Sequence, residues 1–218
     1  MPQQSSDAPI VNIVDDDDSL CRALDSLFRS VGLNTRTYGS VREFLQAGVS
    51  DAPACIVLDV RLPGTSGLEF QAQLAGLGIR LPVILITGHG DIPMSVRAMK
   101  AGAVDFLPKP FRDQDMLDAV TAAIDRDRQR RARDGEAARI VDRFATLSPR
   151  EQQVMLLVAA GKMNKQVAGD LGLSEVTVKI HRGAAMRKMG ARNLADLVRM
   201  ADALKAKELG GPDANTWV

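Results

Sequence analysis

The chain has 218 residues, of which 45% are hydrophobic and 25% charged, and its formal net charge is +1 at pH 7. These values are typical of a globular protein with one large or two ordinary domains. No apolar run approaches the ~20 residues that span a bilayer, and the N-terminus lacks the basic and apolar segments of a secretory signal. We therefore expect a cytoplasmic protein without a membrane partner, in which Cys21 and Cys55 are free, buried thiols.

The small net charge hides an asymmetry along the chain. Residues 1–126 carry 11 basic and 16 acidic side chains, a net charge of −5, whereas residues 127–218 carry 17 basic and 11 acidic ones, a net charge of +6. Halves of opposite charge indicate different partners. The basic half is the candidate for binding nucleic acid.

Short apolar runs alternate with amphipathic stretches through the first half. Five runs are predicted strands: Ile10–Val14, Thr35–Tyr38, Ala54–Asp59, Pro82–Thr87 and Val104–Leu107. Four stretches between them are predicted helices: Asp18–Val31, Ser40–Ala47, Ser66–Leu77 and Ile92–Ala101. Runs such as ACIVLD and PVILIT are apolar nearly throughout, as strands covered on both faces must be. The alternation predicts an α/β fold with a doubly wound, five-stranded parallel sheet.

Chemically active side chains follow the carboxyl ends of four predicted strands, where ligands bind in such sheets. They are Asp15 and Asp16, Asp59, Thr87 and Lys109. Each could be ordinary loop polarity or a helix cap, but their agreement at one edge favours a common site. Three clustered carboxylates favour a bound Mg²⁺ ion. Beside such a cation and Lys109, Asp59 could attack a phosphoryl group as a nucleophile, and Thr87 could donate a hydrogen bond to a phosphoryl oxygen.

Four motifs follow one another along residues 10–125: IVDDDD, CIVLDVRLPGTSG, VILITGHGD and AMKAGAVDFLPKPF. Together they resemble the receiver domain of two-component response regulators, which has a flavodoxin-like fold. The sequences of the motifs are most similar to those of the FixJ branch. The resemblance implies that Asp59 accepts a phosphoryl group. It also implies that Asp16, Asp59 and the backbone carbonyl of Arg61 bind Mg²⁺, with Asp15 helping through water.

The same resemblance assigns a switch and a lysine. Thr87 and Phe106 occupy positions at which a hydroxyl turns toward the phosphoryl group and an aromatic ring turns inward. Lys109 is the lysine characteristic of the family, and its bond to Pro110 is expected to be cis. His89 lies near this edge, but the family pattern gives it no role, so we interpret it as a loop histidine.

The run of four aspartates is thereby divided between two roles. Asp15 and Asp16 belong to the predicted metal site. Asp17 and Asp18 enter the following helix, whose N-terminal dipole favours negative charge. We expect Asp17 to tune the rim of the site at most, and Asp18 to act in the first helical turn.

A charged connection follows the first half. Apolar residues at helical spacing begin the segment 112–145, which then becomes DRDRQRRARDGEAAR. A charge run of this kind usually forms a solvated face. We expect it to extend the fifth helix into a linker that is broken or softened near Gly135. Ile140, Val141 and Phe144 form a short apolar stripe that could pack on the next domain or on a second linker helix.

The last third predicts several short, well-capped helices and therefore a second, smaller all-α domain. Ser148 is a predicted N-cap with Glu151 as its capping-box partner, and Asn164 is expected to cap the next helix. Gly172 lies in the turn before a helix at Glu175–Met189, which carries five basic side chains and one acidic one. Two short helices joined by such a turn fit a helix-turn-helix.

The stretch from LSPREQQV to NLADLV is similar to the LuxR-type helix-turn-helix domain over about 55 residues. The resemblance implies that Glu175–Met189 is the recognition helix. Candidates for base or groove contacts are Val176, Lys179, Ile180 and Arg182. Candidates for backbone contacts or positioning are Asn164, Lys165, Thr177, His181, Arg187 and Lys188. Gly183 departs from several relatives, which place a long polar side chain there, so their operator preference does not transfer.

These features predict a transcriptional regulator of the FixJ/NarL type that is controlled by phosphorylation. The implied partners are a sensor histidine kinase, double-stranded promoter DNA and a second copy of the chain, with RNA polymerase as a further candidate. The expected boundaries are a flexible N-terminus at 1–8, a receiver at 9–126, a linker at 127–144, a DNA-binding domain at 145–208 and a flexible tail at 209–218.

Three alternatives remain open. The acidic site could belong to a phosphatase or phosphotransferase acting on a small molecule, although no segment of 64–108 is long enough to cap a substrate. The chain could bind DNA independently of phosphorylation, with its first half serving only for docking. The basic half could be a helical bundle that binds protein.

Overall fold

The computed structural model describes residues 8–88 and 92–209. The chain divides into two compact units after Arg131, and each is described by itself. The expectations for His89, the first seven residues and residues 210–218 lie outside the described residues. None of the helices in the described part of the chain combines the length and apolar character needed to cross a membrane.

The first unit is built on a five-stranded parallel sheet with the strand order β2-β1-β3-β6-β7. Its strands are β1 (Ile10–Val14), β2 (Asn34–Tyr38), β3 (Ala54–Asp59), β6 (Val83–Thr87) and β7 (Asp105–Pro108). β1 and β3 are buried along their whole length because both faces of the sheet are covered. The predicted doubly wound α/β fold is confirmed.

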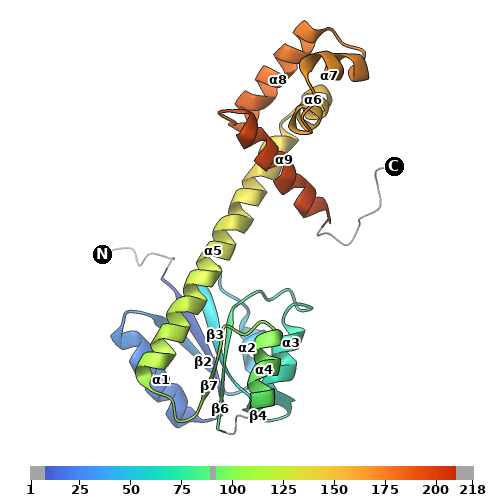
Figure 1. The fold of residues 1–218 in the computed structure, drawn as a ribbon. Coiled ribbons are helices and arrows are strands. Elements are labelled where there is room, and N and C mark those ends of the chain that lie inside the picture. The colour runs from blue at the N-terminus through green and yellow to red at the C-terminus, as the bar shows by residue number, and fades with distance from the viewer. Residues whose placement is uncertain (1–7, 89–91, 210–218) are drawn as a thin grey trace, which may run out of the picture. The chain divides into compact units, whose positions relative to one another are not determined.

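Two layers of helices cover the sheet (Figure 1). One layer holds α1 (Asp18–Ser30) and α5 (Asp113–Ala145), and the other holds α2 (Val41–Ala47), α3 (Gly67–Gln73) and α4 (Ile92–Lys100). Each layer has its own apolar core against the sheet. Leading members of the two cores are Phe28 and Met116 on the α1–α5 side, and Phe44 and Phe70 on the other.

The structure departs from the sequence expectation around α3. The helix ends at Gln73 rather than Leu77, and residues 74–78 continue as turns. These turns close where Gly78 adopts a left-handed φ of 71° and the Ile79 N–H donates back to the Leu74 carbonyl. Two very short strands, β4 (Arg61–Leu62) and β5 (Thr65–Ser66), form an antiparallel pair before α3. Strands of two residues are too short to leave a periodic signal in the sequence.

The expectation of a break near Gly135 is wrong. α5 runs without interruption from Asp113 to Ala145. Gly135 is exposed, and a glycine in a helix costs only about 1 kcal/mol relative to alanine. The surrounding helix formers, such as Arg133, Glu136 and Ala137, outweigh that cost.

The second unit is helical. It contains the last turns of α5, α6 (Pro149–Ala159), α7 (Asn164–Leu171), α8 (Glu175–Met189) and α9 (Leu194–Leu209). The apolar stripe at the end of α5 packs into the core of this unit, where Ile140 is buried. The stripe therefore belongs to the helical unit and not to a separate linker helix.

The predicted caps are largely confirmed. Ser148 accepts a hydrogen bond from the Glu151 N–H, and the Glu151 carboxylate accepts one from the Ser148 N–H. The expectation that Asn164 caps α7 is wrong. Asn164 is the first residue of α7, and the N-cap is Met163, whose N–H donates to Gln166 Oε1 at 2.8 Å. A glutamine in the first turn replaces the cap that the asparagine was expected to supply.

A buried carboxylate joins α5 to the amino edge of the sheet. Asp127 is fully buried and accepts a hydrogen bond of 3.0 Å from the Ala54 N–H at the start of β3. Arg130 and Arg131 donate to the same carboxylate, and Arg131 also donates to two backbone carbonyls of the loop before β3. The first unit thus includes residues 127–131, which the charge pattern had assigned to a linker.

These donors set the ionisation of Asp127. Burial by itself would raise the pKa of this carboxyl, but the hydrogen bonds from Arg131 and Arg130 outweigh it and hold the pKa below its usual value. The carboxylate therefore stabilises the fold fully above the unfolded-state pKa of about 4. This stabilisation is lost as the pH falls through the lower pKa of the folded state.

We predict that Asp127→Asn lowers the free energy of unfolding of the first unit at pH 7 by about 3 kcal/mol, because two guanidinium groups lose their buried anion. The free energy of unfolding of the variant should also fall less than that of the parent chain when the pH drops below 4. Calorimetric unfolding of the full chain at pH 7 and pH 3 measures both effects. Asp125→Asn, which breaks only an exposed ion pair with Arg128, is the matched control and should change stability by less than ~0.5 kcal/mol. Equal effects of the two variants would contradict the assignment.

Candidate functional site

The four consecutive aspartates occupy different environments. Asp15 is only 1% exposed and its Oδ1 accepts the Asp17 N–H at 2.9 Å, whereas Asp16 is exposed. Asp17 is the N-cap of α1, and its Oδ1 accepts two backbone N–H groups of the first turn. Asp17 therefore has a larger structural role than the expected tuning of a rim. Asp18 lies in the first turn, as predicted.

Parallel pairing brings three of the predicted carboxylates together. Val14 pairs with Leu58, so the residues that follow β1 lie beside Asp59 at the end of β3. One carboxylate oxygen from each of Asp15, Asp16 and Asp59 lies within 4.8 Å of the others. This is the convergence that the strand ends predicted.

Lys109 supplies a positive charge to this cluster. Its Nζ lies 2.6 Å from Asp15 Oδ2 and 3.2 Å from Asp59 Oδ1. Burial opposes the charged ammonium, but the hydrogen bond and charge of Asp15 outweigh it, so the pKa of Lys109 is raised. The Lys109 N–H donates to the Thr87 carbonyl at 2.7 Å, and the Lys109–Pro110 bond is cis, as expected.

Asp59 remains poorly compensated in this setting. The side chain is buried, and its Oδ2 accepts the Arg61 N–H at 3.2 Å. Its Oδ1 is shielded from solvent, and the Lys109 ammonium approaches it without good hydrogen-bond alignment. Burial raises the pKa of Asp59 above its usual value, and the charge of Asp15 adds to this, although Lys109 opposes both.

The charge balance fits a divalent cation. Three carboxylates and one ammonium leave a net charge of −2 when all are ionised. Mg²⁺ prefers hard oxygen ligands, and it commonly binds one or two carboxylates and keeps several waters. The exposed Asp16 opens one side of the cluster to solvent, as such a partly hydrated ion needs.

Gly67 is a functional position that the sequence reasoning missed. A Cβ atom on Gly67 would lie 2.1 Å from the backbone oxygen of Asp59, so no larger residue fits without moving the backbone. The Gly67 N–H also donates to the Val60 carbonyl at 2.9 Å. The start of α3 is therefore packed directly against the backbone that carries Asp59. The sequence around Gly67 predicts a helix from Ser66 and gives no indication of this close approach.

The two predicted switch residues lie on neighbouring strands. Thr87 ends β6 and is fully buried, whereas Phe106 in β7 is partly exposed and packs against the core on the α2–α4 side. Leu85 pairs with Phe106, so the aromatic ring is carried by the strand next to Thr87.

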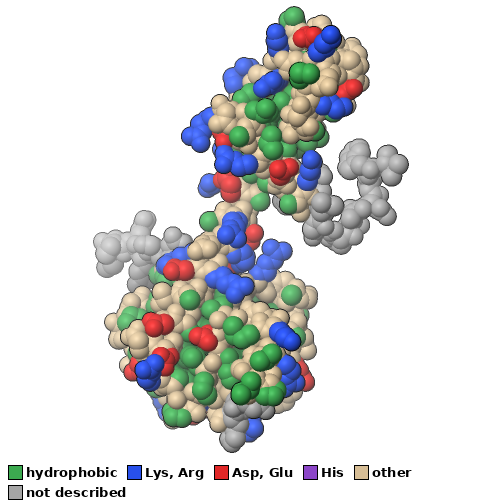
Figure 2. Space-filling view, in the orientation of Figure 1, with side chains coloured by type: hydrophobic (Ala, Val, Ile, Leu, Met, Phe, Trp, Pro, Cys, Tyr) green, Lys and Arg blue, Asp and Glu red, His purple; other side chains and the backbone are tan. Residues whose placement is uncertain are grey.

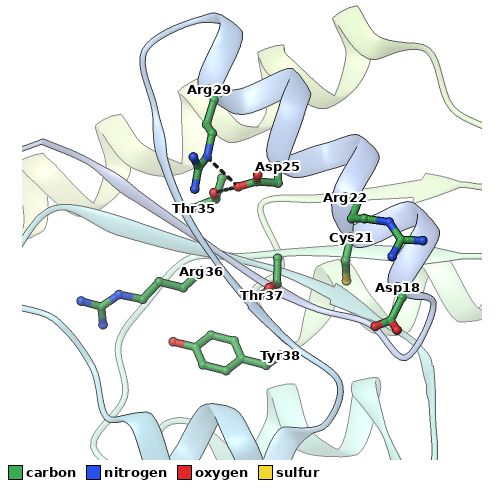
Figure 3. Close-up of a pocket in the computed structure, with 9 residues that line it drawn as sticks. All are labelled: Asp18, Cys21, Arg22, Asp25, Arg29, Thr35, Arg36, Thr37 and Tyr38. Atoms are coloured by element: carbon green, nitrogen blue, oxygen red, sulfur yellow. Dashed lines mark hydrogen bonds and ion pairs between the residues drawn. The ribbon is translucent and has the colours of Figure 1, made fainter.

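A separate hollow of about 600 Å³ lies between α1 and the edge strand β2 (Figure 3). Asp25 faces this hollow, but its carboxylate already accepts hydrogen bonds from Thr35 and Arg29. The Thr35 hydrogen bond is the main reason that the pKa of Asp25 is lowered. Two side chains thus donate hydrogen bonds to this carboxylate, whereas Asp59 Oδ1 is buried without a hydrogen-bond donor.

The second unit presents α8 as its candidate nucleic-acid interface. Val176, Lys179, Ile180 and Arg187 are exposed and lie on one face of the helix, by their spacing of three, four and seven residues. Val178, Ala185 and Met189 on the opposite face are buried in the core. The helix is therefore held by one face and leaves the other accessible.

Not all the predicted contact residues share that accessible face. Lys188 forms an ion pair of 2.6 Å with Glu151, which lies on α6, and this contact lowers the pKa of Glu151. Arg182 donates to Asn164 Oδ1 at 3.3 Å and thereby joins α8 to α7. Lys165 on α7 is exposed, and His181 and Thr177 are partly exposed.

Comparison with known proteins gives two family matches. The model for the response regulator receiver domain matches residues 11–121, and that for bacterial regulatory proteins of the luxR family matches residues 145–201. Nodulation protein W of Bradyrhizobium diazoefficiens is 61% identical over 201 residues, or 92% of this chain and 88% of that protein. Response regulator protein TodT of Pseudomonas putida is 46% identical over the same shares. The solved structure of response regulator StyR is 45% identical, with a TM-score of 0.78, and the match covers 89% of this chain and 98% of that one.

We predict that Mg²⁺ raises the unfolding temperature of the first unit by several degrees, because a ligand at ten times its Kd stabilises the folded state by about 1.4 kcal/mol. Asp16→Asn should remove most of this shift by deleting one carboxylate of the cluster. Asp18→Asn is the matched control, since Asp18 belongs to the same run but lies outside the cluster. Thermal unfolding with and without Mg²⁺ measures the shift, and an equal response of both variants would contradict the site.

Proposed function

Since the chain belongs to the response regulators of two-component systems that join a receiver domain to a LuxR-type DNA-binding domain, we propose that phosphorylation of Asp59 controls its binding to DNA. Proteins of this family are DNA-binding transcriptional regulators. The observation that carries the proposal is the buried Asp59 carboxylate, which lies beside Lys109 and within a cluster of three carboxylates.

The proposed reaction transfers a phosphoryl group from a phosphohistidine of a sensor kinase. A carboxylate oxygen of Asp59 attacks the phosphorus, an O–P bond forms, and the N–P bond breaks with its electron pair passing to the imidazole nitrogen. The Lys109 ammonium, 3.2 Å from Asp59 Oδ1, offsets negative charge on the transferring group. The Thr87 hydroxyl donates to a phosphoryl oxygen once the group is in place.

Three groups would bind the cation directly, namely the carboxylates of Asp16 and Asp59 and the backbone carbonyl of Arg61, and Asp15 would help to hold it. When bound, Mg²⁺ supplies charge stabilisation to the oxygens of the phosphoryl group. The role of Asp15 is divided, because its Oδ2 already accepts from Lys109 and its Oδ1 from the Asp17 N–H. It therefore helps through water rather than as a full ligand.

We propose no turnover of an external substrate. The site lies at a strand edge, and the described residues of the segment 64–108 form short helices and strands of the sheet domain rather than a cap over Asp59. Hydrolysis of the Asp59 acyl phosphate by the protein itself is compatible with this arrangement. Release of phosphate from generic phosphoesters would instead support the enzyme alternative.

The proposed response is a shift toward an active state in which Thr87 and Phe106 move and the face around α4, β7 and α5 is altered. The phosphoryl group must then bind the active state more strongly than the inactive one. Exposed apolar residues of α4, namely Ile92, Val96 and Met99, lie on this face, and Figure 2 shows hydrophobic side chains gathered there. We propose that a second copy of the chain covers them on phosphorylation.

In the second unit, α8 is proposed to enter the major groove while α7 and neighbouring groups hold phosphates. Base or groove contacts are assigned to Val176, Lys179 and Ile180, which lie on the accessible face, whereas Arg182 is assigned to positioning because it donates to Asn164 on α7. Contacts to the DNA backbone, or roles in positioning, are assigned to Asn164, Lys165, Thr177, His181, Arg187 and Lys188. Promoter DNA and a kinase partner place the proposed activity in the bacterial cytoplasm, where RNA polymerase is a further candidate partner.

We predict that Asp59→Asn abolishes phosphate incorporation from a small acyl-phosphate donor with Mg²⁺, because the amide has no nucleophilic carboxylate oxygen. Asp51→Asn, an exposed aspartate in the loop before β3, is the control and should incorporate phosphate normally. Sedimentation of the same samples should show dimers only where phosphate is incorporated. Undiminished incorporation in Asp59→Asn would overturn the assignment, and an unchanged mass after phosphorylation would overturn the dimer.

We predict that Lys165→Gln weakens DNA binding about equally for all sequences and lowers the slope of log K against log salt by about 1, because one phosphate contact is lost. Lys205→Gln on α9 carries the same charge change at another exposed position and should leave the slope unchanged. Titrations of labelled duplex at several salt concentrations measure the slopes. If the slope of log K against log salt is the same for the two variants, α7 is not a phosphate-binding helix.

A further inference from the structure

The accessible face of α8 carries an apolar pair in an otherwise basic helix. Val176 and Ile180 are 67% and 65% exposed, and they lie one turn apart on the same face. Lys179 is exposed beside them. Neither apolar side chain contributes to the core of the second unit, which is formed by the opposite face of the helix. The pair is therefore available to a partner.

Gly183 ends this apolar surface. It lies on the same face, three residues after Ile180 and four before Arg187. A Cβ atom on Gly183 would approach only Arg187 Nη1, at 3.7 Å, so the space next to it is open. The middle of the accessible face thus has no side chain at Gly183. Apolar contacts from this face can therefore come only from the first turns of α8.

Two nearby polar side chains that could read a hydrogen-bonding edge are already engaged. Thr177 Oγ1 lies 2.8 Å from Ser174 Oγ, in the cap of α8. Arg182 donates to Asn164 Oδ1 on α7. The N-terminal half of the accessible face therefore combines two apolar side chains with one ammonium group.

We propose that Val176 and Ile180 recognise the C5-methyl groups of thymines in the major groove. This inference rests on the proposed function of α8 and specifies what the helix reads. The thymine methyl is the only apolar group that a base pair presents in that groove, and side chains without donors or acceptors leave the polar edges of other bases unsatisfied.

The spacing of the pair limits the bases involved. Four residues along a helix rise about 6 Å, less than two base steps of roughly 3.4 Å each. The two side chains therefore contact methyl groups on the same or neighbouring base pairs. Lys179, which can only donate, fits the N7 and O6 acceptors of a guanine beside them.

Deoxyuridine substitution tests this inference, because uracil lacks the methyl group and keeps every hydrogen-bonding group of thymine. The probe is a duplex recovered by selection with the full-length chain, in which each thymine is replaced in turn. We expect one or two positions per half-site at which the replacement weakens binding about fourfold, the value of one buried methyl group. Ile180→Ala or Val176→Ala should abolish that penalty at its own position. Both side chains are largely exposed, so neither variant should disturb the fold.

Leu194→Ala removes an exposed apolar side chain from α9 and is the control, with an unchanged deoxyuridine penalty. Three results would overturn the inference: no thymine shows a penalty, the penalty persists in both α8 variants, or the variants keep full DNA affinity and lose only binding to a protein. If the selection recovers no preferred duplex, the proposed DNA-binding function fails as well. The two failures are thus distinguishable.

Discussion

The ammonium group of Lys109 is the contact on which the first unit is organised. A parallel sheet brings the ends of β1 and β3 together, and their carboxylates would repel one another in a buried setting without a cation. Lys109 reaches Asp15 and Asp59 from the loop after β7, on the far side of β6. One charge thus joins the carboxyl ends of β1, β3 and β7, and the site depends on the correct register of these strands and of β6 between them.

Asp59 and Asp127 have the same side chain, but one is a candidate for chemistry and the other stabilises the fold. Both are buried, and burial raises the pKa of each. Asp127 receives a backbone N–H and two guanidinium groups, so its pKa is lowered and the charge stabilises the fold. Asp59 has a single backbone donor and shares Lys109 with Asp15, so its pKa is raised. The incompletely paired carboxylate is the one left with an interaction to gain from a new ligand.

The sequence predicted the features that depend on local pattern. Apolar runs predict the five strands, and the rule for strand ends places Asp15, Asp16 and Asp59 together, as the structure confirms. The sequence does not predict features that depend on tertiary contacts. Asp127 looked like one member of a solvated charge run because its partner, Ala54, lies 73 residues away. Gly67 gave no sign that it lies against the Asp59 backbone.

The same limit applies to α8, where composition alone cannot sort basic residues by face. Lys179 and Lys188 are equivalent in a charge count, yet one is exposed on the accessible face and the other pairs with Glu151 across the domain. Because that ion pair joins α8 to α6, Lys188 helps to hold α8 in the orientation that exposes Val176, Lys179 and Ile180. The core of the second unit fixes how α8 is rotated about its axis. That rotation decides which basic residues of α8 hold the helix in place and which face a binding partner.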